Sequence, residues 1–395
     1  MNSNIRKSIL ASLARLLDER RSSILDANRI DIVACPAGDD VILDRLKVSG
    51  PKIDAMIASV LGVMDSDDPV GRVISSHIRE NGLRIENRSV PFGTILIIYE
   101  ARPDVSIEAA IIALKAGNKI LLKGGKEARN TNLCLANLWR LALKENDADL
   151  DTVQYLDISR EETQKLIRGE NEKFDLVIPR GGEALINFVL QNSTAPVIVS
   201  GRGNNFLYID SEADFEMAVR IAVNGKQRLS VCNALDKILI SERLPDLSIK
   251  MERLIAALRE HNIEVIGDEK IVAMDPTVSL IADEDVWYEE FLSAKIVIGI
   301  VASPQEAIET INEYSGGHSA AIITANRETA DEFLKEVDCA AVYHNASTRF
   351  TDGGQLGLGA EIAISTQKLH FRGPLGAEHL LTNKWFVYGD GHVRN

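Results

Sequence analysis

The sequence predicts an α/β fold of two domains, each built on a parallel β-sheet. Apolar runs of strand length alternate with helical patterns from about residue 94 to residue 343. Strands interleaved with helices in this way form βαβ units, whose strands are parallel. The chain has 395 residues, of which 45% are apolar, so it can bury a core large enough for two domains.

The N-terminal half begins with helices and continues as alternating strands and helices. Residues 1–65 are expected to be helical, and alternation over residues 83–87 indicates a hairpin in the mixed stretch that ends near residue 92. Beyond it, the predicted strands are residues 94–99, 119–123, 153–156, 174–178 and 196–199, and the predicted helices are residues 106–116, 127–144, 161–167 and 183–191.

The alternation resumes after Cys232 and predicts a second α/β unit. Its boundary is expected near residue 227, which would place Cys232 beside an interdomain cleft. Residues 345–376 are rich in Gly, Ser and Thr without clear periodicity, and a loop of that length is usually functional or disordered. The predicted strands here are residues 237–240, 296–301, 320–323 and 340–343, and the predicted helices are residues 249–260, 305–313 and 329–337.

Composition and spacing exclude several classes of protein. Lys and Arg number 44 against 58 Asp and Glu, a net charge of -14, which argues against a nucleic-acid partner or an anionic membrane. The apolar runs are far shorter than the roughly 18 residues of a membrane span, and a signal-peptide pattern is missing. Four cysteines (35, 134, 232 and 339) and seven histidines show no C-x-x-C or H-x-x-x-H spacing. We therefore expect a cytoplasmic protein without a metal site.

Cys232 is the strongest candidate for a catalytic residue. It lies in the polar stretch 226–233, between a helical pattern and an apolar strand, and open α/β enzymes present reacting groups at such junctions. Lys226 and Arg228 are expected to favour the thiolate, which is the nucleophilic form. The alternative is a half-buried structural cysteine, which these local features do not exclude.

Two strand ends carry candidates for binding an anionic cofactor. Gly181 and Gly182 open a helix after the strand 174–178, where backbone N–H groups and the helix dipole favour an anion. Lys123 ends the strand 119–123, and a lysine at that edge of a sheet can reach a ribose or phosphate. The alternatives are a tight turn and a surface cap, and the G-x-G-x-x-G fingerprint is missing.

Two further polar segments are candidates for contacting a substrate. Asp104 follows a predicted strand and precedes a helix, so it either points into a cleft or caps the helix. The long loop near the C-terminus combines an amide, two hydroxyls and a guanidinium, a mixture that suits a carboxylate or phosphate. Its candidates are Asn345, Ser347, Thr348 and Arg349. The alternative is a loop in which these groups only make hydrogen bonds within the loop.

Six segments together resemble the γ-glutamyl phosphate reductases, a branch of the aldehyde dehydrogenase superfamily. The resemblance extends from about residue 5 to the C-terminus, and the last segment is long and specific to this branch. The segments are VPFGTILIIYEARPDV (90–105), ALKAGNKILLKGGKEARNTN (113–132), DLVIPRGG (175–182), SVCNAL (230–235), SGGHSAAIIT (315–324) and NASTRFTDGGQLGLGAEIAISTQKLHFRGP (345–374).

The resemblance implies an aldehyde dehydrogenase-like fold with three parts. An NADPH-binding domain would occupy residues 1–227 and be completed by about residues 353–380. A catalytic domain with the nucleophilic cysteine would occupy residues 228–352. Residues of about 80–92 and 381–395 would form an oligomerisation flap, so the protein is expected to be a homo-oligomer.

The resemblance also implies the reaction, which is the NADPH-dependent reduction of L-glutamate 5-phosphate to L-glutamate 5-semialdehyde in proline biosynthesis. Cys232 would attack the acyl phosphate, release phosphate and form a thioester, which divides one difficult step into two easier ones. NADPH would then reduce the thioester. The length leaves no room for a fused glutamate 5-kinase, so that enzyme is expected to be a separate chain with a functional coupling to this one.

The resemblance assigns roles residue by residue. Glu290 would hold the nicotinamide ribose of NADPH, together with Lys123, Gly181 and Gly182 on the rest of the cofactor. Asp104 stands where the family usually has Asn, which donates to the oxyanion; a carboxylate would repel an oxyanion unless protonated. Both steps of the implied reaction pass through an oxyanion, so backbone N–H donors around Cys232 are expected.

Other departures concern neighbouring positions. Phe206 and Leu229 stand where His and Pro are common, which affects fine geometry. Residues 199–205 lack the Glu with which hydrolytic aldehyde dehydrogenases activate water, so a reductase is favoured over an aldehyde oxidiser. Two alternatives stay open: an oxidoreductase for another acyl phosphate or aldehyde, and a non-catalytic assembly subunit. Retention of Cys232 argues against the second.

Overall fold

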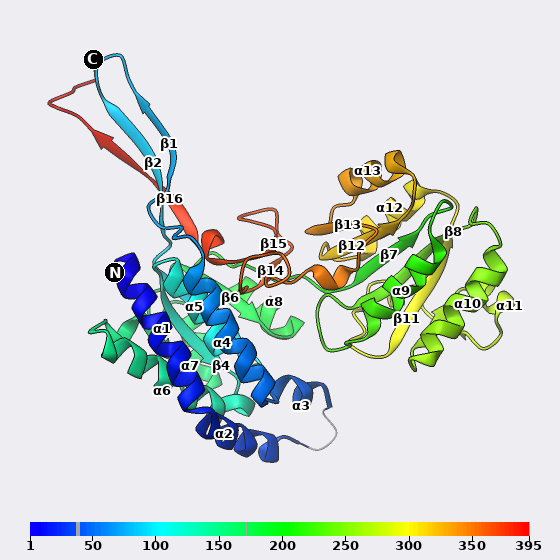
Figure 1. Cartoon of the computed structure of the whole chain (residues 1–395), viewed down its shortest axis with the longest axis horizontal. Coiled ribbons are helices and arrows are strands. Elements are labelled where there is room, and N and C mark those ends of the chain that lie inside the picture. The colour runs from blue at the N-terminus through cyan, green and yellow to red at the C-terminus, as the bar shows by residue number, and fades with distance from the viewer. Residues whose placement is uncertain (37–39, 171, 395) are drawn as a thin grey trace. The chain divides into compact units, whose positions relative to one another are not determined.

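The structure is a computed structural model that describes residues 1–36, 40–170 and 172–394, with the backbone alone for residues 40 and 41. The chain forms two compact units (Figure 1). The first unit comprises Met1–Val199, Gly357–Ala363 and Leu375–Asn395, and the second comprises Ser200–Leu356 and Ile364–Pro374. Each unit contains a parallel β-sheet, so the predicted fold class is confirmed.

The boundary predicted near residue 227 is wrong, because the second unit begins at Ser200. Strand β7 (Asn205–Ile209) pairs with β8 (Leu235–Ser241), so this segment belongs to the second sheet and Cys232 lies inside the second unit. Of the returning segment 353–380, residues 357–363 and 375–380 belong to the first unit and residues 353–356 and 364–374 to the second.

Helices open the first unit, as predicted for residues 1–65, of which residues 37–39 lie outside the described residues. The side chain of Asn2 accepts a hydrogen bond from the backbone N–H of Ile5 and so begins the first helix. Ser49 caps the fourth helix in the same way. Both helices bury an apolar face. The four helices are α1 (Ser3–Glu19), α2 (Arg21–Ala34), α3 (Asp40–Leu46) and α4 (Gly50–Asp65).

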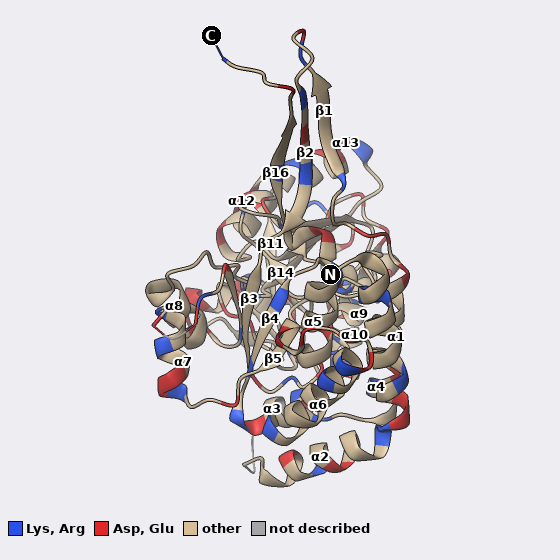
Figure 2. Ribbon diagram, turned by 90° about the vertical axis from the view of Figure 1, so that its left-hand side faces the viewer, with Lys and Arg blue, Asp and Glu red and all other residues tan. Residues whose placement is uncertain are grey.

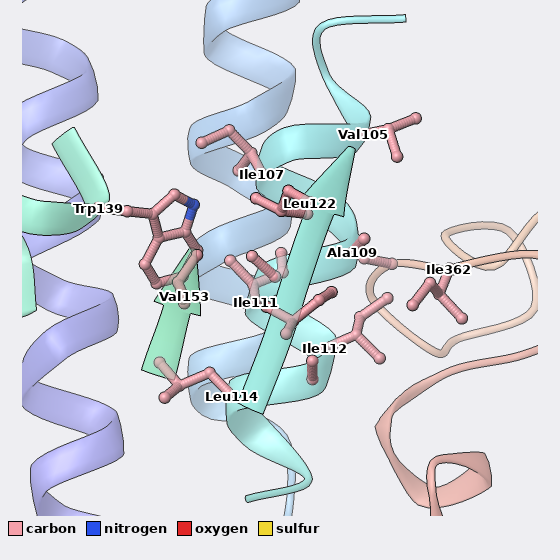
Figure 3. Packing of buried hydrophobic residues seen from close by; sticks show 14 of the residues in the cluster. Val105, Ile107, Ala109, Ile111, Ile112, Leu114, Leu122, Trp139, Val153 and Ile362 are labelled. Carbon is pink, nitrogen blue, oxygen red and sulfur yellow. The ribbon is translucent and has the colours of Figure 1, made fainter. Parts of the chain in front are cut away.

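A four-stranded parallel sheet lies at the centre of the first unit, in the order β5-β4-β3-β6. Side chains alternate between its two faces. Ile97 and Leu122 pack with α1, α4 and two following helices, α5 and α6, and Figure 3 shows Leu122 between side chains of α5 and Trp139 of α6. Leu96 and Val177 pack with α7 and α8. The elements are β3 (Thr94–Tyr99), α5 (Val105–Lys115), β4 (Lys119–Gly124), α6 (Arg129–Glu145), β5 (Val153–Tyr155), α7 (Arg160–Ile167), β6 (Leu176–Arg180) and α8 (Glu183–Asn192).

A second, antiparallel sheet of the first unit joins β1 (Val73–Ile78), β2 (Arg84–Pro91) and β16 (Leu381–Tyr388). The β1–β2 pair confirms the predicted hairpin. All six residues of β1 are exposed, and Ile78 and Trp385 expose 69% and 55% of their surface. This sheet includes parts of the two segments expected to form a flap, of which residue 395 lies outside the described residues.

The second unit contains a seven-stranded parallel sheet in the order β10-β9-β11-β8-β7-β12-β13. Central strands β7 and β8 are buried at every residue, as expected for a sheet covered by helices on both faces. The remaining elements are α9 (Phe215–Lys226), α10 (Leu247–Glu260), β9 (Glu264–Gly267), α11 (Glu269–Met274), β10 (Ser279–Leu280), β11 (Lys295–Val301), α12 (Pro304–Tyr314), β12 (Ser319–Ile323), α13 (Arg327–Glu336), β13 (Ala341–His344), β14 (Ile364–Ser365) and β15 (Gly373–Pro374).

Some predicted elements differ from the structure. The strand predicted at residues 196–199 is reduced to a single bridge between Val177 and Val197. Strands β7, β9, β10 and β16 were not predicted.

Acidic and basic residues are interleaved along α2 and α7 (Figure 2). Within the described part of the chain, no helix has the length and apolarity needed to cross a membrane.

Candidate active site

Four of the predicted site residues lie at the carboxyl edge of the first unit's parallel sheet. Lys123 on β4 and Pro179 on β6 are both register partners of Ile98 on the intervening β3. The glycine pair follows β6, and Asp104 lies in the turn between β3 and α5. The sheet therefore gathers Asp104, Lys123, Gly181 and Gly182 at one edge.

Lys123 is half-buried at the end of β4. Its Nζ donates a hydrogen bond to the carbonyl oxygen of Gly124 at 2.6 Å, the contact expected of a strand-end cap. Burial lowers the pKa of this ammonium, while Asp157 and Glu127 act in the opposite direction. Lys123 is thus a partly desolvated cation with donors left for a ligand.

The glycine turn before α8 is approached by an acidic side chain. A carboxylate oxygen of Glu100 accepts a hydrogen bond from the N–H of Gly182 at 3.0 Å. A β-carbon at Gly181 would lie 2.6 Å from the carboxyl carbon of Glu100, whereas one at Gly182 would meet nothing within 4 Å. The start of α8 therefore binds a carboxylate in this structure through a backbone N–H donor. The space beside Gly182 leaves room for a ligand.

Asp104 precedes α5 but makes no side-chain capping hydrogen bond with that helix. Its carboxylate instead lies 3.1 Å from the ammonium of Lys52 on α4. Glu108, one turn into α5, has its pKa raised to about 8 by burial and by the charges of Asp104 and Glu361. The surroundings of Asp104 are therefore acidic, balanced by Lys52, and the helix-cap alternative is not what the structure contains.

Cys232 lies in the turn between α9 and β8, in the second unit. The side-chain amide of Asn205 donates to the carbonyl oxygens of Cys232 and Ala234, both at 2.7 Å. The Oδ1 of Asn205 accepts from the hydroxyl of Ser319 at 2.5 Å and lies 2.9 Å from Nδ1 of the buried His318. This hydrogen-bonded network fixes the backbone at the cysteine.

Gly203 lies directly against the same backbone. A β-carbon at this glycine would lie 2.7 Å from both the Cα and the carbonyl carbon of Cys232, and nearer still to its carbonyl oxygen. Real β-carbons do not approach neighbours within 3.0 Å. The close approach of these two backbone segments therefore requires glycine at position 203.

The charges around Cys232 differ from those predicted. Lys226 is buried and ion-paired with Asp236, so its charge is neutralised and the expectation that it favours the thiolate is wrong. Arg349 is half-buried, and burial together with the charge of Arg228 lowers its pKa, whereas the charge of Cys232 raises it. Arg349 is therefore a cation that interacts with the charge of Cys232, and Arg228 lies close enough to act on Arg349.

The loop that carries Arg349 contacts the residue after Cys232. The guanidinium of Arg349 donates to Oδ1 of Asn233, and Asn233 donates to the carbonyl oxygens of Arg349 and Thr351 at 3.1 and 2.9 Å. Asp352, whose charge raises the pKa of Arg349, accepts from the backbone N–H of Gly354 at 3.0 Å. The loop is thereby attached to the turn of Cys232 through Asn233.

The other three candidates of this loop have roles in its own structure. Buried Ser347 accepts from the N–H of Arg349 at 3.3 Å, and buried Thr348 donates to the carbonyl of Asn233 at 3.0 Å. The amide of Asn345 pairs with the backbone of Thr324 at the end of β12. Arg349 is therefore the member of this set with the strongest connection to Cys232.

Glu290 is half-buried in the irregular segment between a short 3-10 helix (Glu284–Trp287) and β11. Its charge raises the pKa of Lys226 and Lys237, opposing the effect of their burial. Glu290 thus belongs to a charged cluster beside the amino end of β8.

Sequence reasoning missed Asn205, Gly203 and Asn233 as parts of the site. The segment 199–205 is notable in the sequence for its missing acid and for a Gly-Arg-Gly run that is too short to be a cofactor fingerprint. A Gly-Asn-Asn run just before an apolar strand is a weak signal for a close backbone approach with polar anchors. Asn233, adjacent to Cys232, offered no signal of a contact with a loop more than a hundred residues later.

Comparison with known proteins covers nearly the whole chain. The sequence profile described as the aldehyde dehydrogenase family matches residues 1–279 and 250–359. Gamma-glutamyl phosphate reductase of Thermotoga maritima is 45% identical over 389 residues, which are 98% of this chain and 93% of the relative. Gamma-glutamyl phosphate reductase 2 of Bacillus licheniformis is 45% identical over 388 residues, with coverage of 98% and 91%.

Solved structures show similarity to the same family. The crystal structure of gamma-glutamyl phosphate reductase from Thermotoga maritima has a TM-score of 0.92 at 43% identity, covering 100% of this chain and 95% of that chain. A propionaldehyde dehydrogenase from Rhodopseudomonas palustris has a TM-score of 0.70 at 15% identity, covering 98% and 93%. The second likeness shows the fold alone.

Proposed function

The chain belongs to the aldehyde dehydrogenase family and, within it, to the gamma-glutamyl phosphate reductases, and we propose that it reduces L-glutamate 5-phosphate to L-glutamate 5-semialdehyde with NADPH and releases phosphate. Membership in this family makes it an oxidoreductase of proline biosynthesis. The observation that carries the proposal is identity of 45% across 98% of the chain, with Cys232 in an anchored turn that a guanidinium reaches through Asn233.

Cys232 acts as the nucleophile in this proposal. Its sulfur forms a bond to the acyl carbon while the bond from that carbon to the phosphate oxygen breaks, which gives a thioester and free phosphate. In this proposal Arg349 favours the thiolate by its charge, and so does Arg228, which precedes the cysteine in the same segment. Backbone N–H groups at the turn, rather than the Asp104 carboxylate that pairs with Lys52, stabilise the oxyanion.

Residues of each unit suit a nicotinamide dinucleotide. In the first unit, Lys123 and the start of α8 at Gly181 and Gly182 offer donors to ribose and phosphate oxygens. In the second unit, Glu290 offers a carboxylate to ribose hydroxyls. When bound, NADPH supplies the hydride that converts the thioester to the aldehyde and releases the cysteine thiolate.

Substitution of Lys123 tests the cofactor assignment. Lys123→Ala is expected to weaken NADPH binding by about 1–3 kcal/mol, the scale of a lost hydrogen bond to a charged group, measured by titration of NADPH fluorescence. Lys119→Ala is the matched control, because Lys119 lies at the opposite end of β4, is exposed and pairs with Asp149. Unchanged NADPH affinity in a folded Lys123 variant would leave this lysine as a strand-end cap.

The substrate assignment concerns Arg349 first, with Asn345, Ser347 and Thr348 around it. Arg349→Lys keeps the charge but loses the planar fork that binds a carboxylate or phosphate with two hydrogen bonds. We expect a higher KM for glutamate 5-phosphate with unchanged NADPH affinity. Arg327→Lys, at an exposed ion pair on α13, is the control. Normal substrate kinetics in the Arg349 variant would restrict its role to the contact with Asn233.

The proposed reaction is tested by NADPH oxidation in the presence of a separate glutamate 5-kinase, glutamate and ATP. Absorbance loss that depends on the kinase supports it, and substrate profiling with other acyl phosphates and aldehydes measures its specificity. Faster reduction of another acyl phosphate would overturn the substrate assignment while leaving the reaction type.

Organisation beyond the single chain is part of the same proposal. The first unit takes the role of cofactor domain and the second that of catalytic domain. Exposed apolar residues on β1 and β16, such as Ile78 and Trp385, suit contacts with another copy of the chain, so we propose a homo-oligomer. A cytoplasmic location and a functional coupling to a separate glutamate 5-kinase complete the proposal.

A further inference from the structure

Three charged side chains are buried together in the second unit. Lys226 at the end of α9 and two neighbours on β8, Asp236 and Lys237, expose only 2%, 1% and 0% of their surface. Charged residues are almost never buried to this degree unless they are paired, and burying them is unfavourable. The trio contains two lysines but one carboxylate, which is already paired with Lys226. Lys237 therefore needs a contact outside the trio.

Those contacts lead to one segment. Asp236 pairs with Lys226 through Oδ1 and accepts the backbone N–H of Phe291 through Oδ2 at 3.1 Å. Lys237 donates to the backbone carbonyl of Glu289 at 2.8 Å. The Nζ atoms of Lys237 and Lys226 lie 4.1 and 5.6 Å from the centre of the Phe291 ring, within the range of cation–π attraction.

The residues held in this way flank Glu290 on both sides. Residues 289–291 belong to neither a helix nor a strand, so their backbone groups need partners from elsewhere. Lys237 and Asp236 supply them to Glu289 and Phe291, which restricts the backbone that carries Glu290. Burial lowers the pKa of Lys237 to about 8, with Asp236, Glu289 and Glu290 acting in the opposite direction and Lys226 in the same direction.

We propose that Lys226, Asp236 and Lys237 form a clamp that fixes the backbone on both sides of Glu290 and thereby positions its carboxylate for the ribose of the nicotinamide cofactor. The inference rests on the proposed function, which assigns that ribose to Glu290. The three clamp residues are positioning residues, because their contacts go to Glu289 and Phe291. A role in core stability alone would change unfolding without changing cofactor affinity, and that difference separates the two readings.

The experiment compares variants for NADPH affinity, for the KM of both substrates and for thermal unfolding. Lys237→Met removes the ammonium and keeps an unbranched side chain. Phe291→Leu removes the ring and keeps the main-chain hydrogen bonds. Lys115→Met is the matched control, because Lys115 is also buried and donates to the backbone carbonyls of Met64 and Ser66, in the first unit.

We expect Lys237→Met to raise the Kd for NADPH about tenfold, within the range of coupling inside one network, with the KM for glutamate 5-phosphate unchanged. Phe291→Leu is expected to raise that Kd about threefold, the scale of one cation–π contact. Lys115→Met lowers the unfolding temperature without changing NADPH affinity. Glu290→Gln also weakens NADPH binding, and Lys237→Met adds little to it in the double variant.

Wild-type NADPH affinity in a folded Lys237→Met protein would overturn the clamp. So would full additivity with Glu290→Gln, or an unaffected Glu290→Gln protein, because the clamp acts through that carboxylate. If Lys237→Met does not fold, Phe291→Leu decides, and an unchanged Kd in that variant counts against the inference. Failure of the proposed function is a separate result: wild-type protein would then bind NADPH without oxidising it on addition of glutamate 5-phosphate.

Discussion

Replacement of Cys232 by alanine is expected to lower turnover by at least about 10³-fold, the usual scale for removing a catalytic nucleophile. Without the sulfur no thioester forms, so hydride transfer has no activated acceptor. NADPH binding should stay within about twofold of wild type, because the residues proposed to bind NADPH are all retained in this variant. Steady-state NADPH oxidation and NADPH fluorescence measure the two quantities.

Cys134→Ala is the control for this variant, because Cys134 is also half-buried but lies within α6, and burial raises the pKa of its thiol. Its turnover should equal that of wild type. Mass spectrometry of wild-type protein given substrate without NADPH should detect an acyl group on Cys232. Activity of Cys232→Ala within tenfold of wild type would remove the cysteine from the mechanism.

Sequence periodicity predicted the elements whose local sequence is uniformly apolar or clearly amphipathic. Thr94–Tyr99 is wholly apolar and is β3 in the structure. β16 contains Thr, Asn and Lys, and its partner β2 lies near the other end of the sequence. Its pairing therefore depends on long-range contacts that no local window contains. The prediction of the domain boundary was wrong for the same reason: β7 belongs to the second sheet because it pairs with β8 and with the distant β12.

Charged residues were the second source of error. Lys226 was expected to act on the cysteine because it is six positions away in sequence, yet it is buried against Asp236. Nothing in a single sequence shows that a strand beginning Leu-Asp-Lys buries both charges, since charged residues are normally exposed. The sequence predicted Cys232 and Arg349 as functional residues, but the partners that hold them came from the structure.

Replacement of Gly203 by alanine is expected to lower turnover about 10²-fold, because a displacement of about 1 Å at a reacting group has an effect of this size. The added β-carbon would meet three backbone atoms of Cys232. Backbone atoms cannot rotate away as a flexible side chain can, so the turn itself must shift. Overpacking of this kind also lowers the free energy of unfolding by about 1–3 kcal/mol.

The matched control for this change is Gly50→Ala at the start of α4, where a β-carbon would meet nothing within 4 Å, and both its turnover and its stability should be preserved. NADPH affinity of Gly203→Ala should be unchanged, whereas the rate at which iodoacetamide alkylates Cys232 should change, because the shifted turn alters the distance from the sulfur to Arg349. Wild-type turnover and wild-type alkylation in a folded Gly203→Ala protein would show that the turn tolerates the shift. The network of Asn205, His318 and Ser319 would then be a support for the fold that catalysis does not require.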